Sequence, residues 1–132
     1  MYRLLQPSIS IAILRMLMGG IFIAHATIRL VDYTLPGFGE FLGSKGFPMG
    51  FYLAWTITLF ELVGGLLMVL RKFVRLFCIG EIIILLTGIV LVHFQNGWFV
   101  VGKTLGGIEY SVVLIVVLVA IFLAEKRADK GL

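Results

Sequence analysis

Six ionisable side chains lie inside or at the edges of long apolar stretches of the chain. A charged group at the centre of a bilayer costs at least about 2.5–3.5 kcal/mol on insertion scales. Such groups therefore face a protein interior, pair with one another or reach an interface. A guanidinium and a carboxylate can pair across helices, whereas imidazoles can bind a metal, bind haem, donate to a carbonyl or move protons. The six residues are Arg15, His25, Glu61, Glu81, His93 and Glu109.

Depth along a helix, at about 1.5 Å per residue, sorts these residues into two layers. The inner layer holds Arg15, Glu61 and, less directly, Glu81, which lies near enough to Arg71 and Arg75 to snorkel toward them. Glu61 lies roughly 15 Å from Arg71, close to the midplane. Arg15 is the cation buried within a span, so we expect an Arg15–Glu61 ion pair that holds two helices in register.

The outer layer is the predicted ligand site. His25 and His93 both fall roughly 27 Å from the inner ends of their spans, and Glu109 opens the last span at the same face. Tyr110 follows Glu109 directly. On the first helix, at about 100° per residue, Arg15, His25 and Arg29 fall within an arc of roughly 80°, so one face stays polar.

Four kinds of role remain open for these groups. The two histidines on different helices could ligate haem axially. His25, His93 and Glu109 have metal-ligand chemistry, although no spacing motif specifies a metal site. A quinone or similar apolar ligand would take a His or Arg donor at its carbonyls, with a carboxylate or imidazole to move protons. The fourth possibility is a purely structural role, in which the charged groups form an ion pair, the histidines make hydrogen bonds at the membrane interface, and no ligand is bound.

The amino-acid composition indicates which solvent surrounds these groups. Of 132 residues, 61% are hydrophobic and 14% are charged, with a mean hydropathy of +1.12. A soluble domain carries about half apolar and a quarter charged residues, and a chain of this length cannot bury so much apolar surface. We therefore predict a single-domain integral membrane protein with the lipid bilayer as its partner. The net charge of +4 indicates the positive-inside rule rather than nucleic-acid binding.

Four segments are long enough to span the hydrocarbon core, at roughly 8–31, 50–70, 74–95 and 107–124. Short connections favour an all-α, up-down four-helix bundle. Glycines suited to close helix contacts are Gly19, Gly20, Gly64, Gly65, Gly80 and Gly88. The two longer connections suit headgroup-level loops or a lid of short interfacial pieces. Seven Lys and Arg residues lie on one side, against three on the other, which predicts that both termini are cytoplasmic in a multi-pass inner-membrane protein.

Four stretches in fixed order carry a family resemblance: "LRMLMGGIFIAHATIRL", "FELVGGLLMVL" followed by "RKFVRL", "VHFQNGWF" and "GGIEYSVVLI". Together they resemble the DoxX family of small four-helix bacterial membrane proteins. Two departures are His25-Ala26 where the family often has His-Gly, and Arg29 where it has Lys. The glycine run before Glu-Tyr is also shortened. The family's characteristic polar positions match Arg15, His25, Glu61, His93, Glu109 and Tyr110.

The resemblance implies a function as well as a fold. Family members resemble the small quinone-linked subunit of thiosulfate:quinone oxidoreductase, which implies an accessory redox subunit that binds quinone rather than a stand-alone enzyme. Other membrane redox subunits or a second copy would be its partners. In this interpretation His25 and His93 contact the ligand, with Glu109 and Tyr110 beside them. The alternative, implied by distant eukaryotic relatives, is a membrane-embedded chaperone or assembly factor without chemistry.

Overall fold

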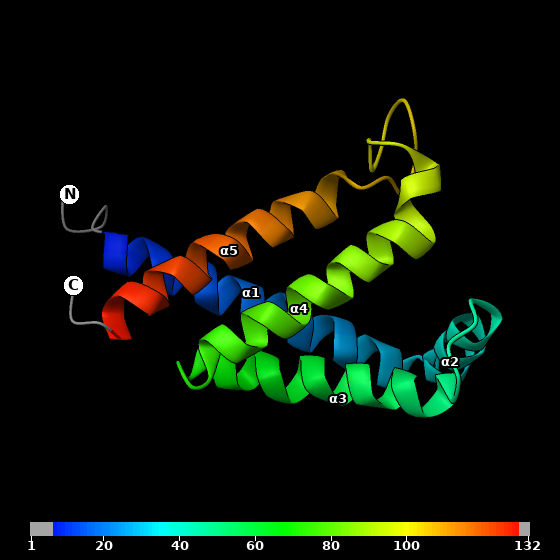
Figure 1. Cartoon of the computed structure of the whole chain (residues 1–132), viewed down its shortest axis with the longest axis horizontal. Coiled ribbons are helices and arrows are strands. Elements are labelled where there is room, and N and C mark those ends of the chain that lie inside the picture. The colour runs from blue at the N-terminus through cyan, green and yellow to red at the C-terminus, as the bar shows by residue number, and fades with distance from the viewer. Residues whose placement is uncertain (1–6, 130–132) are drawn as a thin grey trace. The chain divides into compact units, whose positions relative to one another are not determined.

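The computed structural model describes residues 7–129, and every regular element in this range is helical. Long apolar runs without a period of two exclude half-buried strands and favour helices. The elements are α1 (Pro7–Val31), α2 (Leu35–Ser44), α3 (Gly50–Val69), α4 (Val74–Gly88), a π-helical turn η2 (Ile89–His93), a 3-10 turn η3 (Phe94–Asn96) and α5 (Glu109–Asp129). The all-α prediction is confirmed (Figure 1).

Three helical stretches are long and apolar enough to cross a membrane, namely Ser8–Val31, Gly50–Val69 and Val74–Asn96. They match three of the four predicted spans. The fourth predicted span coincides with α5, in which Glu109, Glu125 and Lys126 fall near the ends of the apolar stretch. Its uncharged interior, residues 110–124, measures roughly 22 Å as a helix. That length is short of a full hydrocarbon core, so the fourth span stays a prediction.

The contacts divide the chain into two compact units, one of residues 16–73 and one of residues 7–15 and 74–129 within the described range. The first unit contains most of α1 together with α2 and α3. The second contains α4, η2, η3 and α5. The predictions of a single domain and of one four-helix bundle stay predictions.

In the first unit, α1 and α3 approach each other through glycines. A Cβ atom built on Gly19 would lie 2.7 Å from the carbonyl oxygen of Gly65, and one built on Gly65 would lie 2.8 Å from the carbonyl oxygen of Gly19. Gly20 has nothing within 4 Å of its Cβ position. Small residues thus bring the two backbones together, as they do in many membrane helix pairs. Met18, Phe22 and Met68 are buried.

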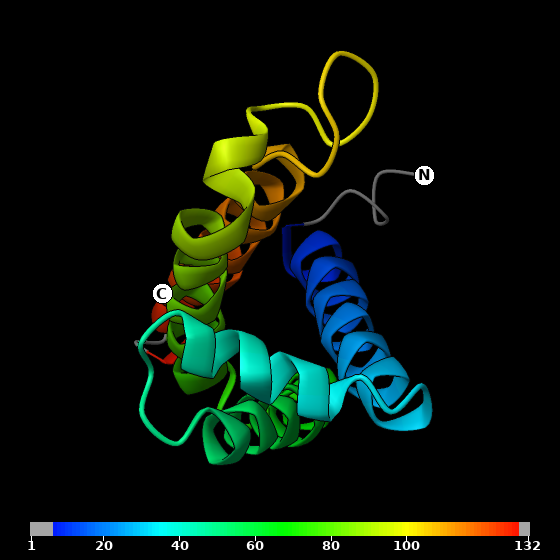
Figure 2. The same cartoon turned by 90° about the vertical axis from the view of Figure 1, so that its right-hand side faces the viewer.

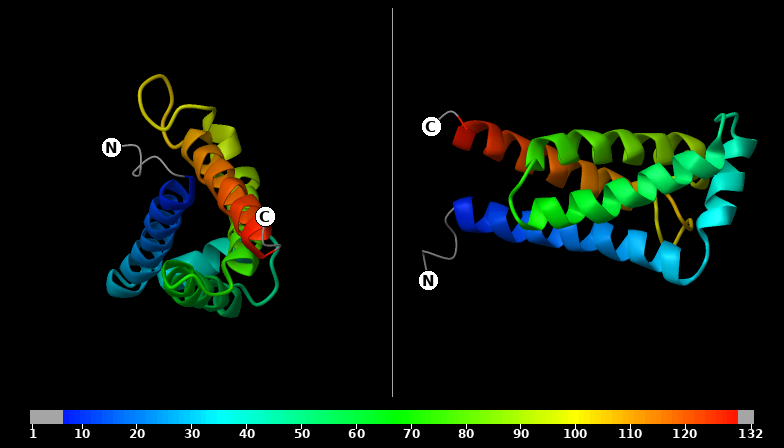
Figure 3. Two further views of the ribbon diagram at one scale, coloured as in Figure 1. Left: turned by 90° about the vertical axis from the view of Figure 1, so that its left-hand side faces the viewer. Right: turned by 90° about the horizontal axis from the view of Figure 1, so that it is seen from below.

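The connecting helix α2 closes one end of this unit. Figures 2 and 3 show it lying across the ends of α1 and α3 rather than along them. A Cβ atom on Gly39 would lie 2.8 Å from the Cα atom of Phe51, so α2 is seated closely on the start of α3. Leu35 and Leu42 are buried along the same helix. The predicted short piece in this connection is a helix, α2, and its place at the membrane interface stays a prediction.

In the second unit, α4 and α5 pack against each other in antiparallel directions (Figure 1). Both helices carry buried apolar side chains. At the far end of α4 the helix widens into the π-helical turn η2 and then tightens into η3. The π turn shifts the following residues around the helix axis. It ends at His93. The buried apolar side chains of α4 and α5 are Val74, Phe77, Cys78, Leu114, Leu118 and Ile121, and Glu81 and Ser111 are buried with them.

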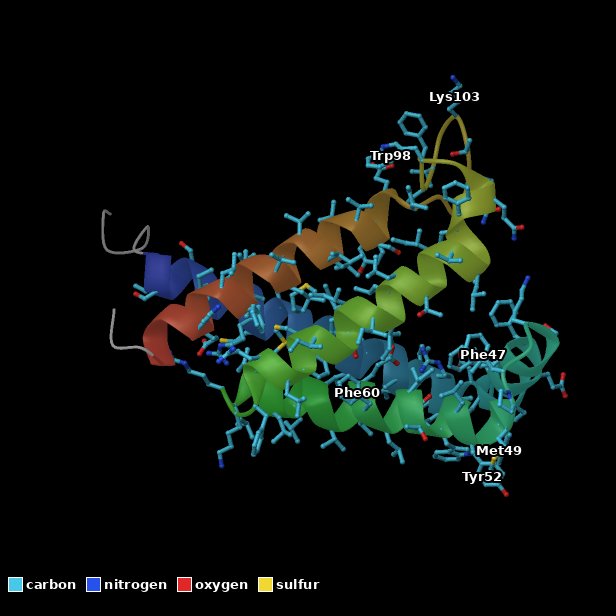
Figure 4. All side chains as sticks on the ribbon, viewed as in Figure 1. Phe47, Met49, Tyr52, Phe60, Trp98 and Lys103 are labelled. Atoms are coloured by element: carbon cyan, nitrogen blue, oxygen red, sulfur yellow. The ribbon has the colours of Figure 1, made fainter. Side chains whose placement is uncertain are left out.

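Met49 directly precedes α3 in a left-handed backbone conformation, with φ 57° and ψ 43°. This conformation costs a residue with a Cβ atom roughly 1–2 kcal/mol. The Met49 side chain is 69% exposed and points away from the unit, as Figure 4 shows. Its removal should therefore cause little loss of packing contacts. Met49→Gly is expected to raise stability by about 0.5–1 kcal/mol, because glycine adopts this conformation freely and is accepted at a helix N-cap.

The measurement for Met49→Gly is thermal unfolding of the purified protein in detergent. Met49→Ala removes nearly the same side chain but keeps the unfavourable backbone conformation, so it serves as the matched control. We expect a higher unfolding midpoint for the glycine variant alone. Equal midpoints for both variants would contradict the proposed backbone cause.

Candidate functional site

An ion pair joins α1 to α3 in the first unit. The Nη1 atom of Arg29 lies 2.7 Å from Oε2 of Glu61. The same Nη1 donates a hydrogen bond of 2.8 Å to Oγ1 of Thr58, and the Thr58 hydroxyl donates in turn to the carbonyl oxygen of Ala54 at 2.8 Å. Thr58 and Glu61 are three residues apart on α3, which places them on one face of the helix. The guanidinium is thus held at two points of a single helix face.

Little of this pair is exposed. The Glu61 side chain is 7% exposed and that of Arg29 is 18% exposed. The aromatic ring of Phe38, on α2, lies 4.7 Å from the Arg29 guanidinium carbon, a distance typical of a cation–π contact. Arg29 also falls in the last turn of α1, where the helix dipole favours a cation. The site therefore combines a buried carboxylate, a partly buried guanidinium and an aromatic cover.

The Glu61 carboxylate is paired with Arg29 and not with Arg15, which corrects the expected partner. Arg15 and Arg29 are separated by fourteen residues of one continuous helix, roughly 21 Å, so Glu61 cannot reach both. The depth estimate located backbones, whereas this pair forms between the ends of two long side chains. Arg15 is itself buried, but it is grouped with the other compact unit.

His25 lies one helical turn before Arg29 and is exposed in this unit. The i, i+4 spacing makes the two side chains neighbours on the surface of α1. The polar arc on the first helix indicated that Arg29 lies on the same polar face as Arg15 and His25. The sequence did not identify Glu61 as the partner of Arg29. Thr58 and Phe38 carried no such signal, because a hydroxyl or an aromatic ring in an apolar helix is common.

The outer residues of the second unit hold a loop together. The His93 Nδ1 atom lies 2.8 Å from the carbonyl oxygen of Gly106, to which the Asn96 amide also donates at 3.3 Å. The backbone N–H of Val100 donates to Oε2 of Glu109 at 3.2 Å. Both predicted ligand residues, His93 and Glu109, thus bond to the backbone of the connection between α4 and α5. This arrangement agrees with the structural interpretation of these two side chains.

The two other predicted ligand residues are Tyr110 and His25. Tyr110 is 45% exposed at the start of α5. His25 belongs to the first compact unit, whereas His93 and Glu109 belong to the second. A joint site of His25, His93, Glu109 and Tyr110 stays a prediction for this reason. Across residues 7–129, no group of three or more His, Cys, Asp and Glu side chains is placed to hold a metal ion.

Comparison with known proteins gives one match. The family model described as DoxX matches residues 10–94, which include most of α1 and all of α2, α3, α4 and the η2 turn. No curated protein and no solved structure matches the chain. The matched range covers Arg29, Thr58, Glu61 and His93, and it ends before the loop that leads to α5.

Proposed function

The chain belongs to the DoxX family, and from this premise we propose that it is an accessory subunit of a membrane redox system that binds a quinone or similar apolar carbonyl ligand. In this proposal it is a multi-pass protein of the inner membrane with both termini cytoplasmic, and α5 completes a four-span bundle. Its partners are other redox subunits or a second copy of the chain. The proposal favours an accessory, quinone-linked subunit over a stand-alone enzyme.

The observation that supports ligand binding is the Arg29–Glu61 pair beside His25. A quinone is a flat apolar ring whose carbonyl oxygens accept hydrogen bonds. A guanidinium has five N–H donors, and both hydrogen bonds that Arg29 makes to described residues leave from Nη1. The other N–H groups of Arg29 can therefore donate to a carbonyl oxygen. In a low-dielectric site such a charge-assisted bond is stronger than a neutral one.

Each neighbouring group has a part in this proposal. Glu61 and Thr58 hold the guanidinium in place, so little side-chain freedom is lost when a ligand binds. The exposed His25 imidazole supplies a second donor one turn away. The ring of Phe38 gives an apolar wall on one side of the guanidinium. His93, Glu109 and Tyr110 are the other residues of the proposed ligand-binding set.

Titration with a menaquinone analogue tests the proposal. The protein is reconstituted in lipid nanodiscs, and binding is followed by quenching of its tryptophan fluorescence. His25→Ala removes one neutral hydrogen bond from an exposed position, so we expect binding about 2–10-fold weaker. Arg29→Gln removes a charged donor, and its expected weakening is roughly 10–100-fold.

Two further variants make the result interpretable. Arg71→Gln removes an arginine from the exposed turn after α3 and should bind like wild type. His93→Ala decides whether the site extends to the outer loop. Equal affinity for the His25→Ala, Arg29→Gln and wild-type proteins would exclude this site. No binding by wild type would overturn the quinone proposal and favour the alternative of an assembly factor without chemistry.

A further inference from the structure

The loop between η3 and α5, residues 97–108, has a defined shape rather than an open one. Four backbone hydrogen bonds of 2.9–3.0 Å close it: Gly106 to Val100, Gly107 to Phe99, Ile108 to Gly97 and Glu109 to Trp98. Three side-chain bonds add to these, from Asn96, from Thr104 to the carbonyl oxygen of Phe99, and between Val100 and Glu109. With the His93 contact, the loop is fastened at both of its ends.

This fastened loop presents large apolar side chains outward. Buried apolar residues are the norm for a loop that folds onto its own protein, whereas contiguous exposed ones mark an interaction surface. Among the large hydrophobic residues of the second unit, Val101 and Leu105 are two of the most exposed. The exposed fractions are 49% for Trp98, 42% for Phe99, 73% for Val101 and 72% for Leu105, and Phe94, just before the loop, is 73% exposed. Lys103 lies among them and is also exposed.

The position of the loop relates this surface to the bilayer. The candidate span Val74–Asn96 ends where the loop begins. The end of a helix that spans the hydrocarbon core lies at the level of the lipid headgroups. Figures 1 and 3 show that the loop leaves the end of α4 to the side instead of continuing along the helix axis. Lys103 stands at the loop tip and points away from the helices in Figure 4. A loop that runs sideways at this level lies along the membrane surface.

We propose, with the topology given under the proposed function as the premise, that residues 97–105 insert their apolar side chains into the interfacial region of the outer leaflet and that Lys103 binds lipid phosphate. Tryptophan is enriched at this level because its ring is apolar and its N–H is polar. A lysine can extend its charged end to the headgroups while its stem covers apolar surface. Because the loop is already ordered by its own hydrogen bonds, insertion loses little conformational freedom. The loop anchors the α4 end of the second unit to the bilayer surface.

The depth of Trp98 tests this proposal directly. The chain contains two tryptophans, so Trp55→Phe leaves Trp98 as the single reporter. The variant is reconstituted in vesicles of phosphatidylethanolamine and phosphatidylglycerol. Lipids brominated near the carbonyl end of their acyl chains should quench Trp98 strongly, because interfacial groups lie about 5–10 Å into the headgroup and acyl boundary. Lipids brominated near the terminal methyl and aqueous iodide should quench it weakly.

Two outcomes overturn the proposal. Strong quenching by iodide would place the loop in water, and shielding from both iodide and brominated lipid would place Trp98 against protein. Leu105→Asp, in the same background, should increase iodide quenching at least several-fold while helical content by circular dichroism is unchanged, because Leu105 is exposed. Unchanged iodide quenching in this variant would also contradict insertion.

The role of Lys103 is tested by lipid charge. Raising the fraction of phosphatidylglycerol should increase Trp98 quenching by brominated lipid in the parent variant but have less effect after Lys103→Gln, since a cation near an anionic surface is attracted to it. Lys45→Gln removes an exposed lysine from the other long connection and is the matched control. Equal responses of Lys103→Gln and Lys45→Gln would exclude a specific contact of Lys103 with phosphate.

Discussion

Replacing Arg29 with Met is expected to destabilise the protein by about 3–5 kcal/mol, since the Glu61 carboxylate would remain buried without its cation. The Glu61 side chain is only 7% exposed, so water cannot replace the lost partner. Unfolding by increasing SDS fraction in mixed micelles measures this free energy.

A double-mutant cycle separates the pair from its surroundings. Glu61→Leu alone leaves the guanidinium without its carboxylate, whereas Arg29→Met with Glu61→Leu removes both charges. Replacing both members of a buried pair with apolar residues is often nearly neutral. The double variant is therefore expected to be more stable than either single variant. A double variant that loses the sum of the two single effects would contradict coupling between Arg29 and Glu61.

The same cycle applied to Arg15 is the matched control. Arg15 is a buried arginine of the same helix, but it lies roughly 21 Å from Arg29 along the axis. Side chains more than about 7–10 Å apart with no shared partner contribute additively to stability. Arg15→Met and Glu61→Leu should therefore show a coupling near zero. A large coupling here would restore the partner that the sequence favoured.

The part of the fold that the sequence predicts best is the length of the spans, which the thickness of the bilayer determines. The spans at 8–31, 50–70 and 74–95 lie within a residue of Ser8–Val31, Gly50–Val69 and Val74–Asn96, because an apolar run must match the hydrocarbon thickness wherever it packs. The last helix, α5, runs to Asp129 instead of ending near 124. Glu125 and Lys126 end the apolar run without ending the helix, since both are good helix formers.

The sequence did not predict which cation pairs with Glu61, and the reason for this is a different one. An isolated carboxylate in an apolar segment requires a cation, which the sequence indicates for Glu61. The identity of that cation depends on the stagger between α1 and α3 and on side-chain reach, neither of which a single helix encodes. Likewise the glycines were recognised as close-packing residues, but which pairs touch is a property of two helices together. Gly19 and Gly65 meet, whereas Gly20 faces open space.

That contrast supports a second large effect. Gly19→Ala is expected to destabilise the protein by about 1–3 kcal/mol, because overpacking forces the backbone to move. The new Cβ atom would lie 2.7 Å from the carbonyl oxygen of Gly65 and 2.7 Å from a methyl carbon of Val69. A side chain can rotate away, but the Gly65 carbonyl is part of α3. The two helices must separate, and both gain exposed apolar surface.

The neighbouring residue is a control within the same turn of helix. Gly20→Ala adds the same atom where nothing lies within 4 Å, and alanine is the better helix former by about 1 kcal/mol, so this variant should be unchanged or slightly more stable. Because the Gly19–Gly65 contact sets the stagger of α1 on α3, it also sets the reach of Arg29 to Glu61. Gly19→Ala should therefore reduce the Arg29–Glu61 coupling measured in the cycle above, whereas Gly20→Ala should leave it intact. Full coupling in a destabilised Gly19→Ala protein would show that the ion pair, and not the glycine contact, fixes how the two helices meet.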